Sequence, residues 1–180
     1  MGVRASKRFR FIGISLIVFT VFCVGRVDRV TAQDRLNVQR VRTSSDTVLA
    51  ALDWGVKYSR IFRGLIDMIN ATDGMVYVDE GTCGHSVRAC LMLDVTLAGP
   101  HRVLRIRVDR RKAQGCALVG VIAHELYHAI EVLRDRGVRS SHEMFSLFDR
   151  LGVRSGDRFE TTGAVRAGLD VGREACRKPS

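Results

Sequence analysis

Apolar side chains recur every three or four positions between residues 46 and 70, which is the spacing of an amphipathic helix. Ser45 or Asp46 can cap the start of this helix, and the pair Asp73-Gly74 follows its end. The pattern therefore predicts one long scaffold helix. The polar stretch within residues 33–44 lacks a clear period and is expected to be a flexible lead-in segment. The apolar positions of the helix are Val48, Leu49, Leu52, Val56, Ile61, Leu65, Ile66 and Ile69.

The pattern changes to that of β-strands after residue 74. Residues 75–79 (MVYVD) and 90–98 (CLMLDVTLA) are short runs rich in residues that favour strands. In residues 102–109 (RVLRIRVD), apolar positions alternate with Arg105 and Arg107, as expected of a half-buried strand. The short turns between these runs indicate a small antiparallel sheet.

Three more helices are expected in the second half of the chain. A long apolar helix covers residues 115–132, and a shorter one starts at Ser140 or Ser141 and ends near residue 152. A final helix is expected from about residue 158 to residue 176. No internal repeat or low-complexity tract divides the chain, so residues 45–180 are expected to form one compact α+β domain.

Residues 1–32 have the organisation of a secretory signal peptide. An apolar stretch of 14 residues, 11–24, lies between a basic start and small residues that end at Ala32. Because about 20 apolar residues are needed to cross a bilayer, we expect cleavage after Ala32 rather than retention in the membrane. An uncleaved anchor is the alternative. Both place the domain outside the cytoplasm, in the periplasm or the extracellular space, and cleavage leaves no stable membrane association.

The net charge of +10 invites a nucleic-acid interpretation. Six of the 29 Lys and Arg residues and one of the 19 acidic residues lie within residues 1–32, so the rest of the chain has 23 basic against 18 acidic residues. The basic residues of that part are spread along the chain and form no cluster interleaved with aromatic residues. They indicate a solvated surface, and no nucleic-acid partner is expected.

Four cysteines remain after the expected leader: Cys83, Cys90, Cys116 and Cys176. An even number of cysteines in an exported chain indicates disulfides. Cys83 and Cys90 could close a local loop, in which case Cys116 and Cys176 would join the long apolar helix to the final helix. Three pairings are possible in principle, and the sequence does not choose among them. Thiolate zinc ligands are less favoured, because no pair has the short spacing of structural zinc sites.

The long apolar helix contains the motif His124-Glu125-Leu126-Tyr127-His128. Residues four apart lie on one face of a helix, so His124 and His128 can aim two imidazoles at one metal ion. Glu125 then lies beside the ion without binding it, where a carboxylate can act as general base. Zinc is the expected metal, because it supplies an activated water and polarises a scissile carbonyl.

A catalytic zinc site usually has three protein ligands, so a third ligand is needed. Glu131 is about 10 Å further along the helix axis than His124, so it is expected to support the ligands or to lie on the surface rather than to bind the ion. The third ligand should come from a separate element. Glu160, expected in the first turn of the final helix, is the first choice; His142, Glu143 and Asp157 are the alternatives.

Two segments, HELYHAIEV and FETTGAVRAGLDV, resemble the gluzincin branch of the zincin metallopeptidases over roughly the last third of the chain. They are also similar to small exported bacterial proteins with a HELxHAxEV motif followed by FET. The resemblance implies a zincin-like domain in which His124, His128 and Glu160 bind zinc and Glu125 is the base. In zincins an edge strand pairs with bound peptide, a role that suits residues 102–109, although a strand in the sheet core is an equal alternative.

These features predict an exported zinc-dependent peptidase that acts on a peptide or protein substrate. The chain departs from many gluzincins in having Ala164 where they have an acidic residue that orients a histidine, and no Tyr or His is evidently placed to stabilise an oxyanion. The alternative is therefore a non-catalytic, zinc-stabilised binding domain of the same fold. A third hypothesis, a basic exported protein attached to membrane or envelope polymers, rests on charge and an uncleaved leader.

Overall fold

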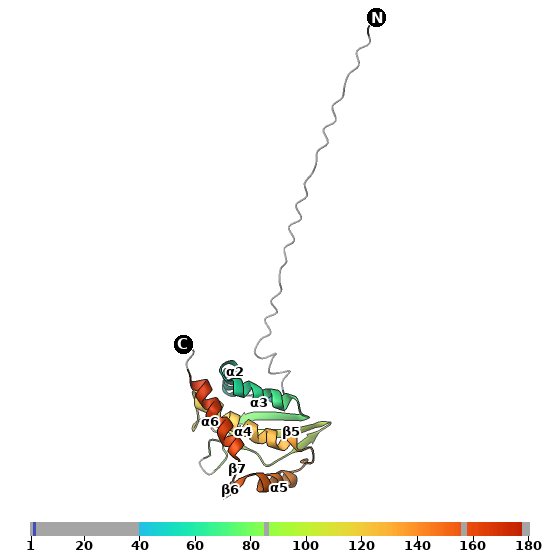
Figure 1. Cartoon of the computed structure of the whole chain (residues 1–180), viewed down its shortest axis with the longest axis vertical. Helices are drawn as coiled ribbons and strands as arrows, with labels where there is room; N and C mark the ends of the chain where they lie inside the picture. Colours follow the sequence, from blue (N-terminus) through green and yellow to red (C-terminus); the bar gives the residue numbers. More distant parts are fainter. Residues whose placement is uncertain (1, 3–39, 85–86, 156–157, 178–180) are drawn as a thin grey trace.

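The computed structural model describes residue 2 and residues 40–84, 87–155 and 158–177, and the expected signal peptide lies almost entirely outside this part of the chain. The described residues form an α+β domain, as predicted (Figure 1). Its strands are β1 (Val41–Arg42), β2 (Gly74–Glu80), β3 (Ala89–Leu91), β4 (Thr96–Ala98), β5 (His101–Val108), β6 (Val153–Ser155) and β7 (Arg158–Glu160). Its helices are α2 (Asp46–Tyr58), α3 (Arg60–Asn70), α4 (Gly115–Arg134), α5 (Ser141–Leu151) and α6 (Thr162–Cys176).

The predicted scaffold helix is two helices, α2 and α3, because the backbone of Ser59 is extended. Ser59 ends α2 and also caps α3, where its hydroxyl accepts a hydrogen bond from the amide of Phe62. The same hydroxyl donates to the carboxylate of Glu174, which lies on α6. A helix-period pattern continues through the break, so the sequence prediction of one continuous helix is wrong at this point.

The main sheet is mixed rather than antiparallel, which corrects the sequence prediction. Its order is β1-β2-β5-β3, with β4 also paired to β5. β1 and β5 both run parallel to β2, whereas β3 and β4 pair antiparallel with the other edge of β5. β5 is therefore an inner strand, and the free edge on its far side belongs to β3 and β4. β1 lies within the segment expected to be a flexible lead-in.

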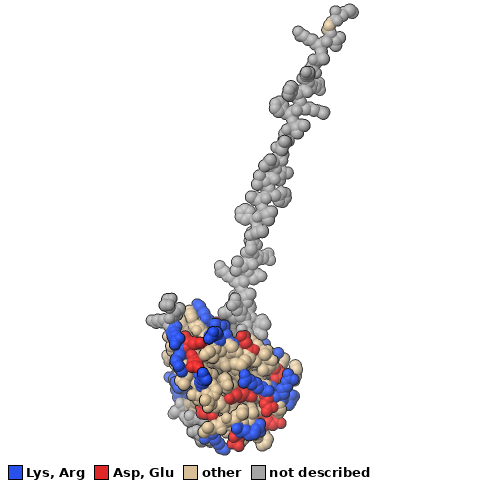
Figure 2. Space-filling model, viewed as in Figure 1, with Lys and Arg blue, Asp and Glu red and all other residues tan. Residues whose placement is uncertain are grey.

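One face of the sheet is buried beneath the helices. Val76 and Val78 on β2 and Leu104 and Ile106 on β5 are fully buried. Positions between them, such as Arg105, point to solvent and complete the alternation expected of a half-buried strand. On the face of the molecule shown in Figure 2, basic and acidic side chains are interspersed.

α4 is the central helix of the domain. Among the described residues it alone is long and apolar enough to cross a membrane, but two thirds of its apolar window is buried inside the domain. It packs antiparallel to α6 at close range because glycines face each other: a Cβ on Gly120 would lie 2.8 Å from the carbonyl oxygen of Gly168. A Cβ on Gly163 would lie 2.4 Å from the ring of Tyr127. Small residues therefore set how near α6 approaches the motif helix.

Two disulfides connect the four cysteines. Cys116 at the start of α4 is bonded to Cys176 at the end of α6, with Cα atoms 5.2 Å apart. Cys83 is bonded to Cys90, with Cα atoms 5.9 Å apart, and this bond closes the loop before β3. The structure thus selects one of the three pairings that the sequence leaves open, and the two bonds indicate a non-reducing compartment.

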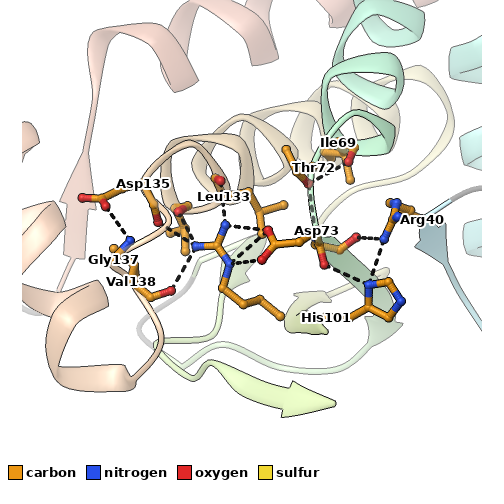
Figure 3. A network of polar contacts seen from close by, with 12 residues as sticks. Arg40, Ile69, Thr72, Asp73, His101, Leu133, Asp135, Gly137 and Val138 are labelled. Atoms are coloured by element: carbon orange, nitrogen blue, oxygen red, sulfur yellow. Dashed lines mark hydrogen bonds and ion pairs between the residues drawn. The ribbon is translucent and has the colours of Figure 1, made fainter. Parts of the chain in front are cut away.

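The end of α4 is held by a buried arginine, Arg102, whose acceptors Asp73, Leu133, Asp135 and Val138 are labelled in Figure 3. Arg102 is only 1% exposed, although its position on β5 belongs to the apolar face of the strand. Its guanidinium donates to the carboxylate of Asp73, with a shortest distance of 2.7 Å. It also donates to four backbone carbonyl oxygens at and just beyond the end of α4, those of Val132, Leu133, Asp135 and Val138. The sheet and the motif helix are therefore fixed to each other at this end.

Candidate metal centre

The two motif histidines lie on one face of α4, as the four-residue spacing predicts. Their ring centroids are 4.9 Å apart. His128 is 5% exposed, whereas His124 is half-buried. Leu126 and Ala129, on the other faces of α4, are fully buried in the core. The helix therefore presents both imidazoles from a rigid, packed position.

Glu160 approaches these histidines from a different element. It is the last residue of β7, and the final helix begins only at Thr162, after the N-cap Thr161. The expectation that Glu160 lies in the first turn of that helix is wrong, because the hydroxyl of Thr161 accepts a hydrogen bond from the amide of Ala164 and starts the helix there. The β6–β7 pairing and the start of α6 together hold the backbone of Glu160.

The alternatives to Glu160 are placed differently. The carboxylate of Glu143 accepts a hydrogen bond from the amide of Arg139 at the start of α5, so it forms part of the helix cap. His142 is exposed on α5. Asp157 lies outside the described residues. Among the described residues, the group that could hold a metal ion is therefore His124, His128 and Glu160, whose ligand atoms all lie within 4.8 Å of one another.

Two of these side chains have buried polar atoms without a hydrogen-bond partner. They are Nε2 of His128 and Oε2 of Glu160. Nε2 of His124 lies 3.2 Å from the same carboxylate oxygen, close enough for an ion pair although no hydrogen bond is formed. Buried polar atoms are normally satisfied. A cation between the three side chains would satisfy these atoms together, so the residues fit a metal ion.

Glu131 sets the orientation of His128. Its carboxylate oxygen lies 2.8 Å from Nδ1 of His128, and it is largely buried. A carboxylate at this distance favours the tautomer in which Nδ1 carries the proton and Nε2 is left as the lone-pair donor. Of the two roles expected for Glu131, support of a ligand and a surface position, this contact matches the first.

Glu125 is buried beside the cluster and held by the edge strand. Its carboxylate accepts a hydrogen bond of 2.7 Å from the backbone amide of Leu91 on β3. Burial raises the pKa of Glu125 to about 7, although His128 and the Leu91 amide act in the opposite direction. A carboxyl group with a pKa near neutrality can both accept and return a proton. No residue type in the sequence signals this role of the Leu91 amide, because every residue except proline carries a backbone donor.

Burial also lowers the pKa of His124, and the nearby His128 lowers it further. The carboxylate of Glu160 opposes both effects. A lowered pKa keeps the imidazole neutral near pH 7, which is the form that binds a metal ion.

A pocket of about 180 Å³ opens beside the cluster. His124, Glu125, His128 and Glu160 all line it. The remaining lining residues are Cys83, Val87, Ala89, Cys90, Leu91, Leu93, Phe148 and Phe159. No sequence motif connects these residues with the site, because they come from β3, its flanking loops, α5 and β7.

Strand β5 and the side chain of Tyr127 are the remaining neighbours of the site. Strand β5 is an inner strand and cannot serve as the edge that pairs with a peptide, so that role is excluded for residues 102–109. Tyr127, which lies between the two histidines of the motif, packs against Gly163 of α6.

Comparisons of the chain with protein-family models, with curated proteins and with solved structures gave no significant match.

Proposed function

We propose that the chain is an exported zinc-dependent peptidase in which His124, His128 and Glu160 bind the zinc ion. The observation that supports this proposal is the convergence of three potential ligands beside a buried glutamate, Glu125, at the wall of a pocket. Two histidines and one carboxylate form a known ligand set of catalytic zinc sites, which leave one position open for water or substrate. The resemblance of the two motif segments to gluzincins also favours this proposal.

When bound, zinc lowers the pKa of a coordinated water to about 7 and polarises the carbonyl of the bond to be cut. The residues of the chain supply the rest. Glu131 keeps the Nδ1 proton on His128 and so presents Nε2 to the ion. Glu125 takes the proton of the attacking water and later transfers it to the leaving amine. The Leu91 amide holds the Glu125 carboxylate in place during both transfers.

The proposed location outside the cytoplasm is supported by two features. The disulfides Cys83–Cys90 and Cys116–Cys176 require a compartment that is not reducing. Residues 1–32 have the composition of a signal peptide. A mature N-terminus at Gln33, measured by mass spectrometry of the exported protein, is the expected result, and a chain that retains residues 11–24 would contradict cleavage.

Metal analysis and peptide cleavage together test the proposal. The wild-type protein should contain one zinc per chain and cleave members of a mixed peptide library. Glu125→Gln should retain the zinc and lose cleavage, whereas Glu160→Ala should lose both. His142→Ala is the matched control, because His142 is exposed on α5 outside the cluster, and it should retain both properties. Cleavage that survives Glu125→Gln would reject the mechanism.

A non-catalytic, zinc-stabilised binding domain is the second candidate. It is favoured by the composition of the pocket: apart from the three proposed ligands and Glu125, none of its described lining residues has a side chain that donates a strong hydrogen bond to an oxyanion. This candidate predicts stoichiometric zinc and a loss of stability in a chelator, without turnover of any peptide. Cleavage that depends on Glu125 would reject it.

A further inference from the structure

We infer that the pocket beside the metal cluster binds a medium-sized apolar side chain of a peptide, from a residue that flanks the bond to be cut. The inference rests on the proposed peptidase function and specifies its substrate class. It is carried by the chemistry, the size and the position of the pocket wall.

Apart from the three proposed ligands and Glu125, the described part of the pocket wall is apolar or formed by a disulfide. Its described side chains include two phenylalanines, two leucines, a valine and an alanine, together with the sulfur atoms of Cys83–Cys90. None of them carries a charge. A charged or amide side chain placed against these apolar residues would lose its hydration without gaining a hydrogen-bond or ionic partner from them, which is unfavourable. An apolar side chain gains free energy from the same transfer.

The volume of the pocket selects a size class. An engineered apolar cavity of about 150 Å³ binds benzene. The pocket measures about 180 Å³, and part of this space borders the metal cluster. A leucine, isoleucine, methionine or phenylalanine side chain is therefore of suitable size. A glycine or alanine would leave most of the wall in contact with water, and the loss of that burial weakens binding.

Two aromatic rings bring this wall next to the proposed ligands. The ring of Phe148 meets the His128 ring edge-on, with centroids 5.4 Å apart. Phe159 directly precedes Glu160, and its ring stacks on Phe148 at 5.9 Å. A side chain that rests on these rings keeps its own peptide group beside the cluster, so recognition and chemistry are coupled through neighbouring residues.

Phe159, one of the residues that line the pocket, is also held by residues that do not line it. Phe145 on α5 meets Phe159 edge-on at 5.2 Å. The guanidinium of Arg154 lies 5.7 Å from the Phe145 ring and 6.0 Å from the Phe159 ring. These contacts join α5 to the β6–β7 pair. A rigid pocket wall discriminates between side chains better than a wall that rearranges around each of them.

Leu93 offers a way to change the wall without disturbing the core. It lines the pocket, lies between β3 and β4, and is 39% exposed. Leu97 on β4 is a matched control, because it is 47% exposed and is not a lining residue. Leu93→Arg places a cation at the rim, whereas Leu97→Arg adds the same charge elsewhere.

The experiment uses peptides that differ at one position on either side of the bond that is cut, with leucine, glycine or glutamate at that position. Calorimetry on the zinc-loaded Glu125→Gln protein measures binding without turnover, and the wild-type protein measures kcat/KM on the same peptides. We expect leucine to be favoured over glycine and over glutamate by at least about tenfold on one side of the bond. Leu93→Arg should reduce the preference for leucine over glutamate, and Leu97→Arg should leave it unchanged.

Equal binding and equal kcat/KM for the three peptides would overturn the inference, and this result requires no substitution in the pocket. Cleavage without side-chain preference would reject the apolar pocket and leave the peptidase proposal standing. Selective binding of the leucine peptide without any cleavage by the wild-type protein would support the pocket and reject the peptidase. The two proposals therefore fail in distinguishable ways.

Discussion

Replacement of Arg102 by methionine should strongly destabilise the protein. Methionine keeps much of the apolar stem but removes every donor of the guanidinium. The carboxylate of Asp73 then loses its partner, and four carbonyl oxygens around the end of α4 lose their donor. Figure 3 labels four of the residues that accept these hydrogen bonds, Asp73, Leu133, Asp135 and Val138.

The size of the stability loss depends on how deeply the groups that contact Arg102 are buried. Removal of one member of a buried ion pair costs about 3 to 5 kcal/mol, and each buried acceptor left unsatisfied costs about 1 to 3 kcal/mol. Asp73 is 36% exposed, so water can replace part of its lost interaction. The carbonyl oxygens of Val132, Leu133 and Val138 bond Arg102 in buried surroundings and have less access to water. We therefore expect a loss of about 3 to 5 kcal/mol in the free energy of unfolding.

Urea denaturation followed by circular dichroism, with disulfides intact and a chelator present, measures this loss without a contribution from bound metal. Arg105→Met is the matched control, because Arg105 lies on the same strand, is 58% exposed and pairs with Asp79 at 3.6 Å. Its loss should be below about 1 kcal/mol. Arg102→Lys should fall between the two, because lysine keeps the charge but not the planar fork. Equal stabilities for Arg102→Met and Arg105→Met would refute the reasoning.

Three other predictions concern the site and its supports. Glu131→Gln should weaken zinc binding by about 10- to 100-fold, measured by competition with a chelator, because His128 loses the carboxylate at its Nδ1. Serine replacement of both cysteines in the Cys116–Cys176 bond, which spans 60 residues, should lower the free energy of unfolding by about 4 kcal/mol. The same replacement of Cys83–Cys90, which spans 7 residues, should lower it by about 2 kcal/mol. Only the Cys83–Cys90 replacement should also reduce kcat/KM, because that bond lines the pocket. In metal-free protein, the raised pKa of the Glu125 carboxyl contributes stability that is present below pH 4.5 and is lost as the pH rises through about 7. Glu125→Gln should remove this pH-dependent change in the free energy of unfolding.

Each of these has a control and a contradicting result. Asp149→Asn removes one exposed carboxylate from α5 and should leave the zinc affinity unchanged; an equal fall in both variants would show a general charge effect. Equal kcat/KM values for the two disulfide variants would contradict the prediction that the Cys83–Cys90 bond contributes to the pocket. The pH experiment measures the difference in stability between the wild-type and Glu125→Gln proteins at pH 5 and at pH 8. The lowered pKa of His124 changes stability with pH in the direction opposite to Glu125, but it does so in both proteins and therefore cancels in the difference. A constant difference between the proteins would contradict the prediction.

The sequence by itself determined the features that depend on local periodicity and residue type. The α+β class, the position of the motif helix and the common face of His124 and His128 follow from the apolar spacing, because the period of a helix is a local property. Glu160 was identified as a potential ligand from its residue type and its distance along the chain. The structure brings it to the histidines, but from a strand end rather than from a helix.

The tertiary structure alone decided the features that depend on partners distant in the chain. α2 and α3 separate at Ser59, where a carboxylate from α6 accepts a hydrogen bond from the capping hydroxyl. β2 pairs in parallel with β5, although β3 and β4 lie between them in the sequence. Arg102 is buried because Asp73 and the carbonyls at the end of α4 surround it, and the Leu91 amide meets Glu125 at the free edge of the sheet. A local pattern shows which face of an element is apolar, but not which group from elsewhere in the chain will meet it, because such contacts are selected by the packing of the whole domain.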